Sequence, residues 1–150
     1  MEKRLSTKPD LIGKALLKKT PDKIKDNLYL GNKGHAEDLE HLYELGVNVV
    51  VQISDAPRPP PFPEYFVYLP LVFADVDEQE VLQYCEVGAA FIAHNIKHRC
   101  IFVHCNGGIS RSATIIIAYL MLFEDLSFDD ALDFVQSKRA CVSPNDGFVM

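Results

Sequence analysis

Short apolar runs alternate along the chain with longer amphipathic stretches. The runs have the length of buried strands, and we predict strands at residues 27–31, 47–53, 66–71 and 100–103. The longer stretches have the spacing or length of helices, and we predict helices at residues 36–45, 79–98, from Ser112 onward and from Ser127 onward. Strands that alternate with helices indicate a single α/β domain with a central, mostly parallel sheet flanked by helices.

One connection in this pattern is rich in proline. Residues 56–63 contain five prolines, which remove main-chain donors and fix φ, so the segment cannot join a sheet interior or a helix. A PxxP ligand for a partner domain is one interpretation. We favour the other, a rigid surface connection between two strands.

Size and composition indicate one domain in a reducing compartment. The chain has 150 residues, of which 48% are hydrophobic and 24% charged. Its four cysteines show no CxxC pairing, and residues 1–10 lack the apolar core of a signal peptide. The longest apolar run, residues 115–123, is shorter than the roughly 20 residues of a membrane span. We therefore predict an intracellular protein, cytoplasmic or nuclear, without a membrane span.

Charge divides the chain into a basic leader and an acidic body. Residues 1–25 carry eight Lys and Arg against three Asp and Glu, while the rest carries seven against eighteen. An acidic body argues against nucleic-acid binding, which requires a basic face. We predict a leader at residues 1–22, either partly helical or disordered and solvated, and a folded domain at residues 23–150. A kinase with an acidic groove, or an anionic lipid, is an alternative partner for the leader.

Candidate chemistry lies in residues 101–112, where a strand runs through a glycine-containing loop into a helix. Successive main-chain N–H groups of such a loop can turn inward, and the helix dipole adds positive potential, so the loop is suited to bind an anion. Gly107 and Gly108 permit φ values that other residues resist. The amides, the dipole and Arg111 favour the thiolate of Cys105, and the Arg111 guanidinium can hold two phosphate oxygens. This combination indicates phosphoryl transfer to sulfur.

These residues resemble the signature of the cysteine-based phosphatases, His-Cys-x5-Arg-[Ser/Thr]. His104, Cys105, Arg111 and Ser112 match it, and residues 108–114 are similar to the dual-specificity branch. The resemblance extends from residues 24–31 to residues 143–148. It implies a phosphatase-like fold with a Cys-x5-Arg phosphate-binding loop between strand and helix, and catalysis that needs neither a metal nor another cofactor.

The resemblance also implies the roles of individual residues. Cys105 would be the nucleophile that forms a phosphocysteine, and Arg111 the phosphate clamp. Asp75 would be the general acid, with Asp77 as the alternative. The supporting residues would be Ser112, which stabilises the departing thiolate, His104, which orients the loop, and Asn145, which braces it. Main-chain N–H groups of Asn106, Gly107, Gly108, Ile109, Ser110 and Arg111 would bind the phosphate oxygens.

The predicted substrate is a phosphoprotein. The loop lacks the lysines typical of phosphoinositide phosphatases, and the acidic body disfavours an RNA 5′-phosphate. Phosphotyrosine-only enzymes of the resembled family are larger and carry an extra recognition loop, so the resemblance implies a shallower site here, which accepts phosphotyrosine and phosphoserine or phosphothreonine alike. A scaffold module that binds phosphoproteins with little turnover is the alternative from another class. His94 and His98 lie four residues apart, but no further ligand accompanies them, so we predict no metal site.

Overall fold

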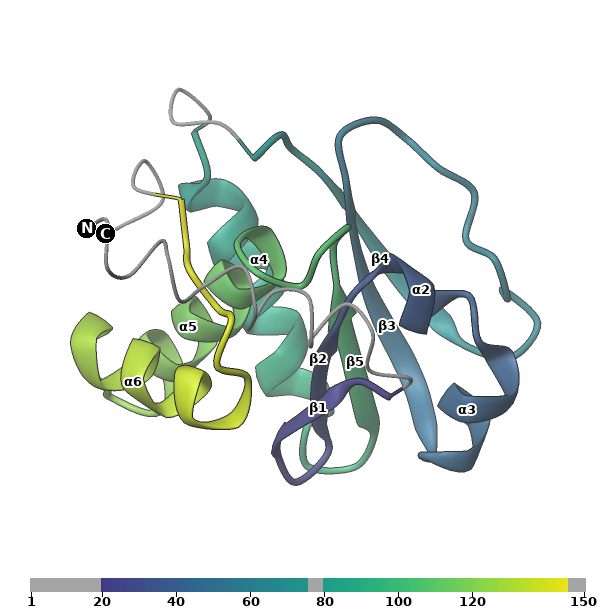
Figure 1. The fold of residues 1–150 in the computed structure, drawn as a ribbon, viewed down its shortest axis with the longest axis horizontal. Coiled ribbons are helices and arrows are strands. Elements are labelled where there is room, and N and C mark those ends of the chain that lie inside the picture. Colours follow the sequence, from purple (N-terminus) through teal and green to yellow (C-terminus); the bar gives the residue numbers. More distant parts are fainter. Residues whose placement is uncertain (1–19, 76–79, 146–150) are drawn as a thin grey trace.

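The computed structural model describes residues 20–75 and 80–145. A five-stranded sheet with the order β1-β2-β5-β3-β4 forms its centre (Figure 1). Only β1 pairs antiparallel with its neighbour, and the other pairs are parallel, as predicted. The strands are β1 (Asp22–Lys25), β2 (Leu28–Gly31), β3 (Val47–Ser54), β4 (Val67–Val72) and β5 (Cys100–His104).

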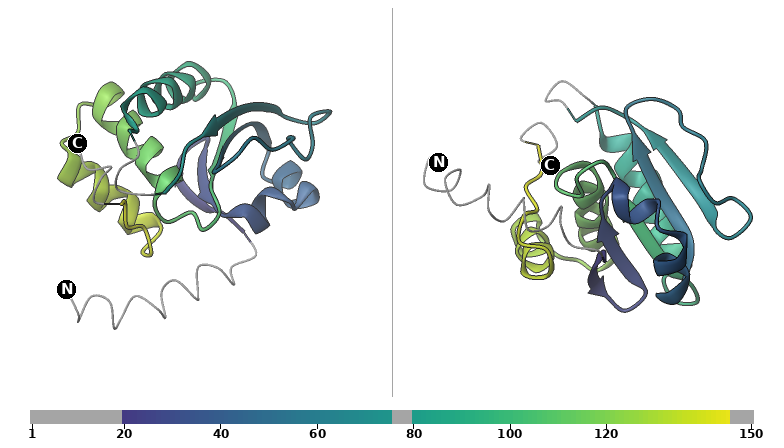
Figure 2. Two further views of the ribbon diagram at one scale, coloured as in Figure 1. Left: turned by 90° about the horizontal axis from the view of Figure 1, so that it is seen from above. Right: turned by 45° about the vertical axis from the view of Figure 1, so that its right-hand side comes forward.

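Helices cover both faces of this sheet. They are α2 (Lys33–Ala36), α3 (Leu39–Glu44), α4 (Leu82–Asn95), α5 (Arg111–Phe123) and α6 (Phe128–Lys138). Figure 2 shows α4, α5 and α6 on one side of the sheet and the short helices α2 and α3 on the other. No helix of the described segments is long and apolar enough to cross a membrane.

The two central strands explain why both faces are covered. Val49 and Val51 of β3 join the larger core beneath α4 and α5, whereas Val50 joins the smaller core beneath α3. Phe102 of β5 likewise faces the smaller core, and its neighbours Ile101 and Val103 face the larger one. Side chains of a strand alternate between faces, so a continuous apolar run is stable only where helices bury both faces.

The first predicted helix differs in the structure. Residues 36–45 do not form one helix, because Asp38 interrupts it and caps a new one, α3, by accepting a hydrogen bond from the His41 amide at 3.1 Å. A separate short helix, α2, precedes it and begins with Asn32 as its N-cap.

Two further boundaries also differ. The predicted helix at residues 79–98 is shorter and runs only from Leu82 to Asn95. Strand β1 was not predicted, and it begins at Asp22, the last residue assigned to the leader. The remainder of the leader prediction, residues 1–19, lies outside the described residues.

The proline-rich segment forms the connection between β3 and β4. It contains no regular helix or strand, as predicted, and three side-chain hydrogen bonds hold it to the sheet. Gln52 Nε2 donates to Arg58 O at 3.2 Å, Ser54 Oγ donates to Ala56 O at 2.7 Å, and Tyr68 Oη accepts from Phe62 N at 3.2 Å. The loop is therefore fixed at both ends by residues of β3 and β4, beside the carboxyl end of β5.

Candidate active site

Cys105 lies where the central strand ends and a loop begins. Strand β5 is buried along its whole length, and helix α5 starts six residues after Cys105 at Arg111. Cys105 is 3% exposed, and its Sγ lies 3.1 Å from the Ser112 Oγ in the first turn of α5. The carboxyl ends of parallel strands are the common position of ligand sites in α/β sheets.

Every carbonyl group of residues 106–110 accepts a hydrogen bond from outside the loop. The donors are Lys33 N to Asn106 O (3.0 Å), Arg139 Nη2 to Gly107 O (2.9 Å), Arg139 Nε to Gly108 O (2.8 Å), Ser143 N to Ile109 O (2.9 Å), and Thr114 N and Oγ1 to Ser110 O (2.8 Å each). In a trans peptide the C=O and the following N–H point in opposite directions. Carbonyls held outward therefore turn the N–H groups of residues 107–111 toward the centre of the loop.

Only one of the two loop glycines needs its conformational freedom. Gly108 has a φ of 67°, and a Cβ there would overlap the carbonyl group of Gly31. Both glycines permit such φ values, but Gly107 is not in the left-handed region. Gly108 is thus the residue that allows the loop to close against β2.

Arg139 supports the loop from behind. It follows α6, is 1% exposed, and uses its remaining nitrogen, Nη1, to pair with Asp22 Oδ2 at 2.9 Å. One guanidinium group thereby joins two loop carbonyls to strand β1. Planar, fixed donors suit this task better than a lysine ammonium would.

Arg111 uses only part of its hydrogen-bonding capacity within the described residues. Its Nη1 pairs with the exposed carboxylate of Asp55 and also donates to Phe73 O at 3.2 Å. Its Nε is buried and has no hydrogen-bond partner in the part of the chain that the structure describes. A buried donor without a partner is costly, and a bound phosphate oxygen would satisfy it.

Asp75 lies at the far end of the loop. Its Oδ1 accepts hydrogen bonds from Ser110 Oγ at 2.9 Å and from Asn145 Nδ2 at 3.4 Å, and Asn145 N donates to Ser110 Oγ at 2.9 Å. The structure thus brings Asp75 and Asn145 together at Ser110. The alternative acid, Asp77, lies outside the described residues.

Comparison with known proteins identifies the family. The sequence matches the family described as "Dual specificity phosphatase, catalytic domain" over residues 28–150. The chain belongs to this family. Dual specificity protein phosphatase 22 of Xenopus tropicalis is 35% identical over 128 residues, which cover 85% of this chain and 60% of the relative. The human protein of that name is also 35% identical over 128 residues, covering 85% of this chain and 68% of the relative.

Solved structures of relatives share the fold. The human tyrosine phosphatase-like serine/threonine/tyrosine-interacting protein superposes with a TM-score of 0.80 at 30% identity, covering 88% of this chain and 92% of the other. Human DUSP28 superposes with a TM-score of 0.80 at 28% identity, covering 88% of this chain and 89% of the other. The chain therefore has the fold of these dual-specificity phosphatase relatives.

His104 lies inside this phosphatase domain as an uncharged ring. Burial lowers the pKa of His104 to about 4, and the ring stacks on Phe102 with centroids 5.3 Å apart. Its Nδ1 lies 3.4 Å from Cys105 O, and a carbonyl only accepts, so this contact requires the proton on Nδ1. Its Nε2 has no hydrogen-bond partner among the described residues.

Sequence reasoning missed three contributions to this site. Arg139 and Asp55 were not singled out, and the Ser110 hydroxyl, which links Asp75 to Asn145, was considered only through its main chain. The position of Asp55 directly after buried strand β3 was the available signal, because the ends of parallel strands meet at one sheet edge. No comparable signal marks Arg139. No group of three or more potential metal ligands occurs within residues 20–75 and 80–145.

Arg139→Met is expected to destabilise the domain. The substitution removes the donors to two loop carbonyls and the ion pair with Asp22, and breaking a buried pair costs about 3–5 kcal/mol of unfolding free energy. Urea unfolding followed by circular dichroism measures this loss. Lys138→Met, at the exposed neighbour, is the control and should change stability by less than about 1 kcal/mol. An Arg139→Met protein as stable as the control would contradict the supporting role.

His104→Gln should change how stability depends on pH. The unfolded chain binds a proton at His104 near pH 6.5, while the folded chain does so only near the pKa of about 4. Between these values wild-type stability should fall with falling pH by up to about 1.4 kcal/mol per unit from this residue. His104→Gln removes that part of the slope, and the two proteins should run parallel from pH 7 to 8. A stability difference that stays constant from pH 4 to 8 would refute this assignment.

Proposed function

We propose that this domain hydrolyses phosphoproteins through a phosphocysteine intermediate. The observation that carries the proposal is the loop around Cys105, whose carbonyls all face outward and whose N–H groups therefore converge on one position. Helix α5 adds its dipole at the same point, and Arg111 adds a buried Nε without a protein partner in the described residues. These groups suit the three equatorial oxygens of a phosphoryl group, where charge accumulates in the transition state.

In the first step the Cys105 thiolate attacks phosphorus. The S–P bond forms as the bond from phosphorus to the leaving oxygen breaks, and protonated Asp75 donates its proton to that oxygen. Ser110 and Asn145 hold Asp75 at the edge of the loop, so no large rearrangement is needed to bring it there. Asp55 acts as a positioning residue, because it fixes the Nη1 end of Arg111 and leaves the other edge open.

In the second step water releases the phosphate. The Asp75 carboxylate takes a proton from the attacking water, the new P–O bond forms, and the S–P bond breaks. The Cys105 thiolate leaves toward the Ser112 hydroxyl, 3.1 Å away, which donates a hydrogen bond to the sulfur. His104, which contacts the Cys105 carbonyl, holds the nucleophile's main chain.

Both phosphotyrosine and phosphoserine or phosphothreonine are the proposed substrates. The family supports phosphoproteins in general, and the uncharged loop residues 106–110 do not favour a phosphoinositide. The alternative is a phosphoprotein-binding scaffold. One structural relative supports keeping this alternative, because its name describes a phosphatase-like interacting protein. The chain spans 60% of the length of the two Xenopus relatives. The activity of a longer protein that contains this domain is therefore also a proposal.

Cys105→Ser should abolish hydrolysis of p-nitrophenyl phosphate by the purified chain. Serine is a much weaker nucleophile at neutral pH, so turnover should fall by at least about 10³-fold. Cys100→Ser, at the other end of β5, is the matched control and should keep most of the activity. Wild-type protein that binds phosphopeptides but hydrolyses neither them nor the aryl phosphate would favour the scaffold.

Asp75→Asn should lower turnover more than substrate binding. Loss of a general acid costs roughly 10²-fold to 10⁴-fold, and the loss should be greatest for poor leaving groups, such as a phosphothreonine alkoxide. Steady-state kcat and KM for a phosphothreonine peptide and for p-nitrophenyl phosphate give both values. Asp133→Asn, an exposed position on α6, is the control. An Asp75→Asn enzyme with wild-type kcat on the peptide would move the acid role elsewhere.

A further inference from the structure

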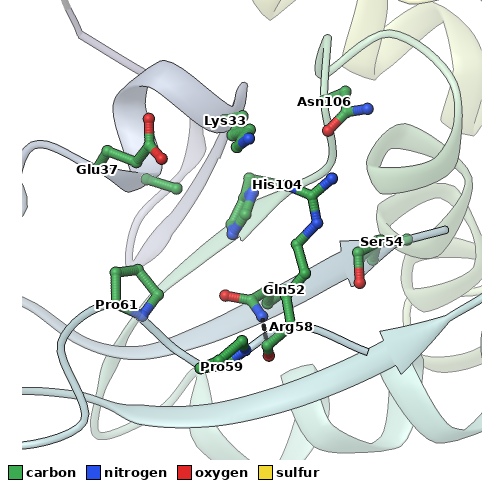
Figure 3. Close-up of a pocket in the computed structure, with 11 residues that line it drawn as sticks. Lys33, Glu37, Gln52, Ser54, Arg58, Pro59, Pro61, His104 and Asn106 are labelled. Atoms are coloured by element: carbon green, nitrogen blue, oxygen red, sulfur yellow. Dashed lines mark hydrogen bonds between the residues drawn. The ribbon is translucent and has the colours of Figure 1, made fainter. Parts of the chain in front are cut away.

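A cavity opens beside the proposed catalytic loop. It has a volume of about 210 Å³ and lies between α2 and the proline-rich connection of β3 and β4. Figure 3 shows the Arg58 side chain extending from that connection into the space between His104 and Asn106, with Lys33 across the cavity. None of the roles described above uses Lys33 or Arg58 as a side chain.

The cavity wall is positive in an otherwise acidic domain. Lys33 and Arg58 face it with one acidic residue, Glu37, and the fourth titratable side chain, His104, is uncharged at neutral pH because burial lowers its pKa to about 4. Only seven Lys and Arg residues occur between residues 26 and 150, against eighteen Asp and Glu. Two of these seven therefore line this one cavity, which selects for an anionic ligand.

Hydrogen bonds fix the backbone positions of both cationic residues. Lys33 N donates to Asn106 O at 3.0 Å, which joins α2 to the catalytic loop. Gln52 Nε2 donates to Arg58 O at 3.2 Å, and prolines on both sides of Arg58 restrict the backbone of the connection. The backbone of the two walls is thus fixed before a ligand arrives, which lowers the entropic cost of binding.

The position of the cavity relates it to the nucleophile. His104 and Asn106, the residues on either side of Cys105, both line it. Asp75 approaches the other end of the loop at Ser110. An extended peptide advances about 3.3–3.6 Å per residue, so a side chain one to three positions from the phosphorylated residue would reach the cavity.

We propose that this cavity is a substrate subsite for a second anionic side chain, either a carboxylate or a second phosphoryl group, within three residues of the phosphorylated residue. The inference rests on the proposed function for its choice of a peptide ligand. Lys33 and Arg58 bind the anion, the apolar walls formed by Pro59 and Pro61 receive the stem of the side chain, and Glu37 opposes binding. The subsite makes the domain selective for substrates that carry two neighbouring negative groups.

Binding to the Cys105→Ser protein tests the subsite without turnover. Fluorescent phosphotyrosine peptides would carry alanine, glutamate or phosphoserine at each of three positions on either side, and anisotropy would give each Kd. At one side of the phosphotyrosine, glutamate or phosphoserine should lower Kd by roughly threefold to tenfold relative to alanine, as expected for two partly exposed cations. The gain should shrink as salt is raised.

Charge-matched variants locate the effect. Lys33→Gln with Arg58→Gln should reduce the gain to less than twofold, and Glu37→Gln should increase it. The control, Lys97→Gln with Arg99→Gln, makes the same change of charge at exposed positions before β5, at the opposite end of that strand, and should keep the gain. An equal loss of the gain in both double variants would mean a general charge effect and overturn the subsite.

The remaining outcomes separate the two anions and the two proposals. A gain with phosphoserine alone would assign the subsite to a second phosphate, and an equal gain with glutamate to any acidic side chain. No gain at any position overturns the subsite, even if wild-type protein hydrolyses p-nitrophenyl phosphate. A gain that needs Lys33 and Arg58 in a protein without that hydrolysis would support the subsite and reject the catalytic proposal.

Discussion

The proposed active site depends on the direction in which five peptide groups point. A loop of residues 106–110 could satisfy its N–H groups with its own carbonyls or with water, and it would then have no affinity for an anion. Donors outside the loop instead form a hydrogen bond with each carbonyl group, so the N–H groups of the same peptide units face inward. The positive centre proposed to serve Cys105 and a phosphate is therefore a consequence of how the surrounding elements hold the loop.

Those surrounding elements come from distant parts of the chain. Helix α2 supplies Lys33 N, α5 supplies Thr114, and the segment after α6 supplies Arg139 and Ser143. The Arg139 charge is itself buried and needs Asp22 of β1, 117 residues away, as its partner. The antiparallel strand at the sheet edge thus contributes to the catalytic loop, although it lies far from Cys105 in sequence.

Four of the few cationic residues of the domain lie at the proposed site or beside it. In a domain with few cations, Arg111 and Arg139 are committed to the loop, while Lys33 and Arg58 line the neighbouring cavity. The rigid connection between β3 and β4 has two consequences here: it carries Asp55 to the outer end of Arg111 and Arg58 to the cavity. We therefore propose that the β3–β4 connection serves both catalysis, through Asp55, and substrate selection, through Arg58.

Features that depend on neighbours along the chain could be derived from the amino-acid sequence. Buried strands, the proline-rich connection and the strand–loop–helix around Cys105 and Arg111 could be predicted because spacing and local conformation encode them. Helix boundaries were predicted less well, because Asp38 caps a new helix inside the predicted helix at residues 36–45. Three contacts emerged from the folded chain instead: Arg139 with Asp22, Arg111 with Asp55, 56 residues apart, and Asp75 with Asn145. Such contacts arise from the order of strands in the sheet, and no local pattern of residues specifies that order.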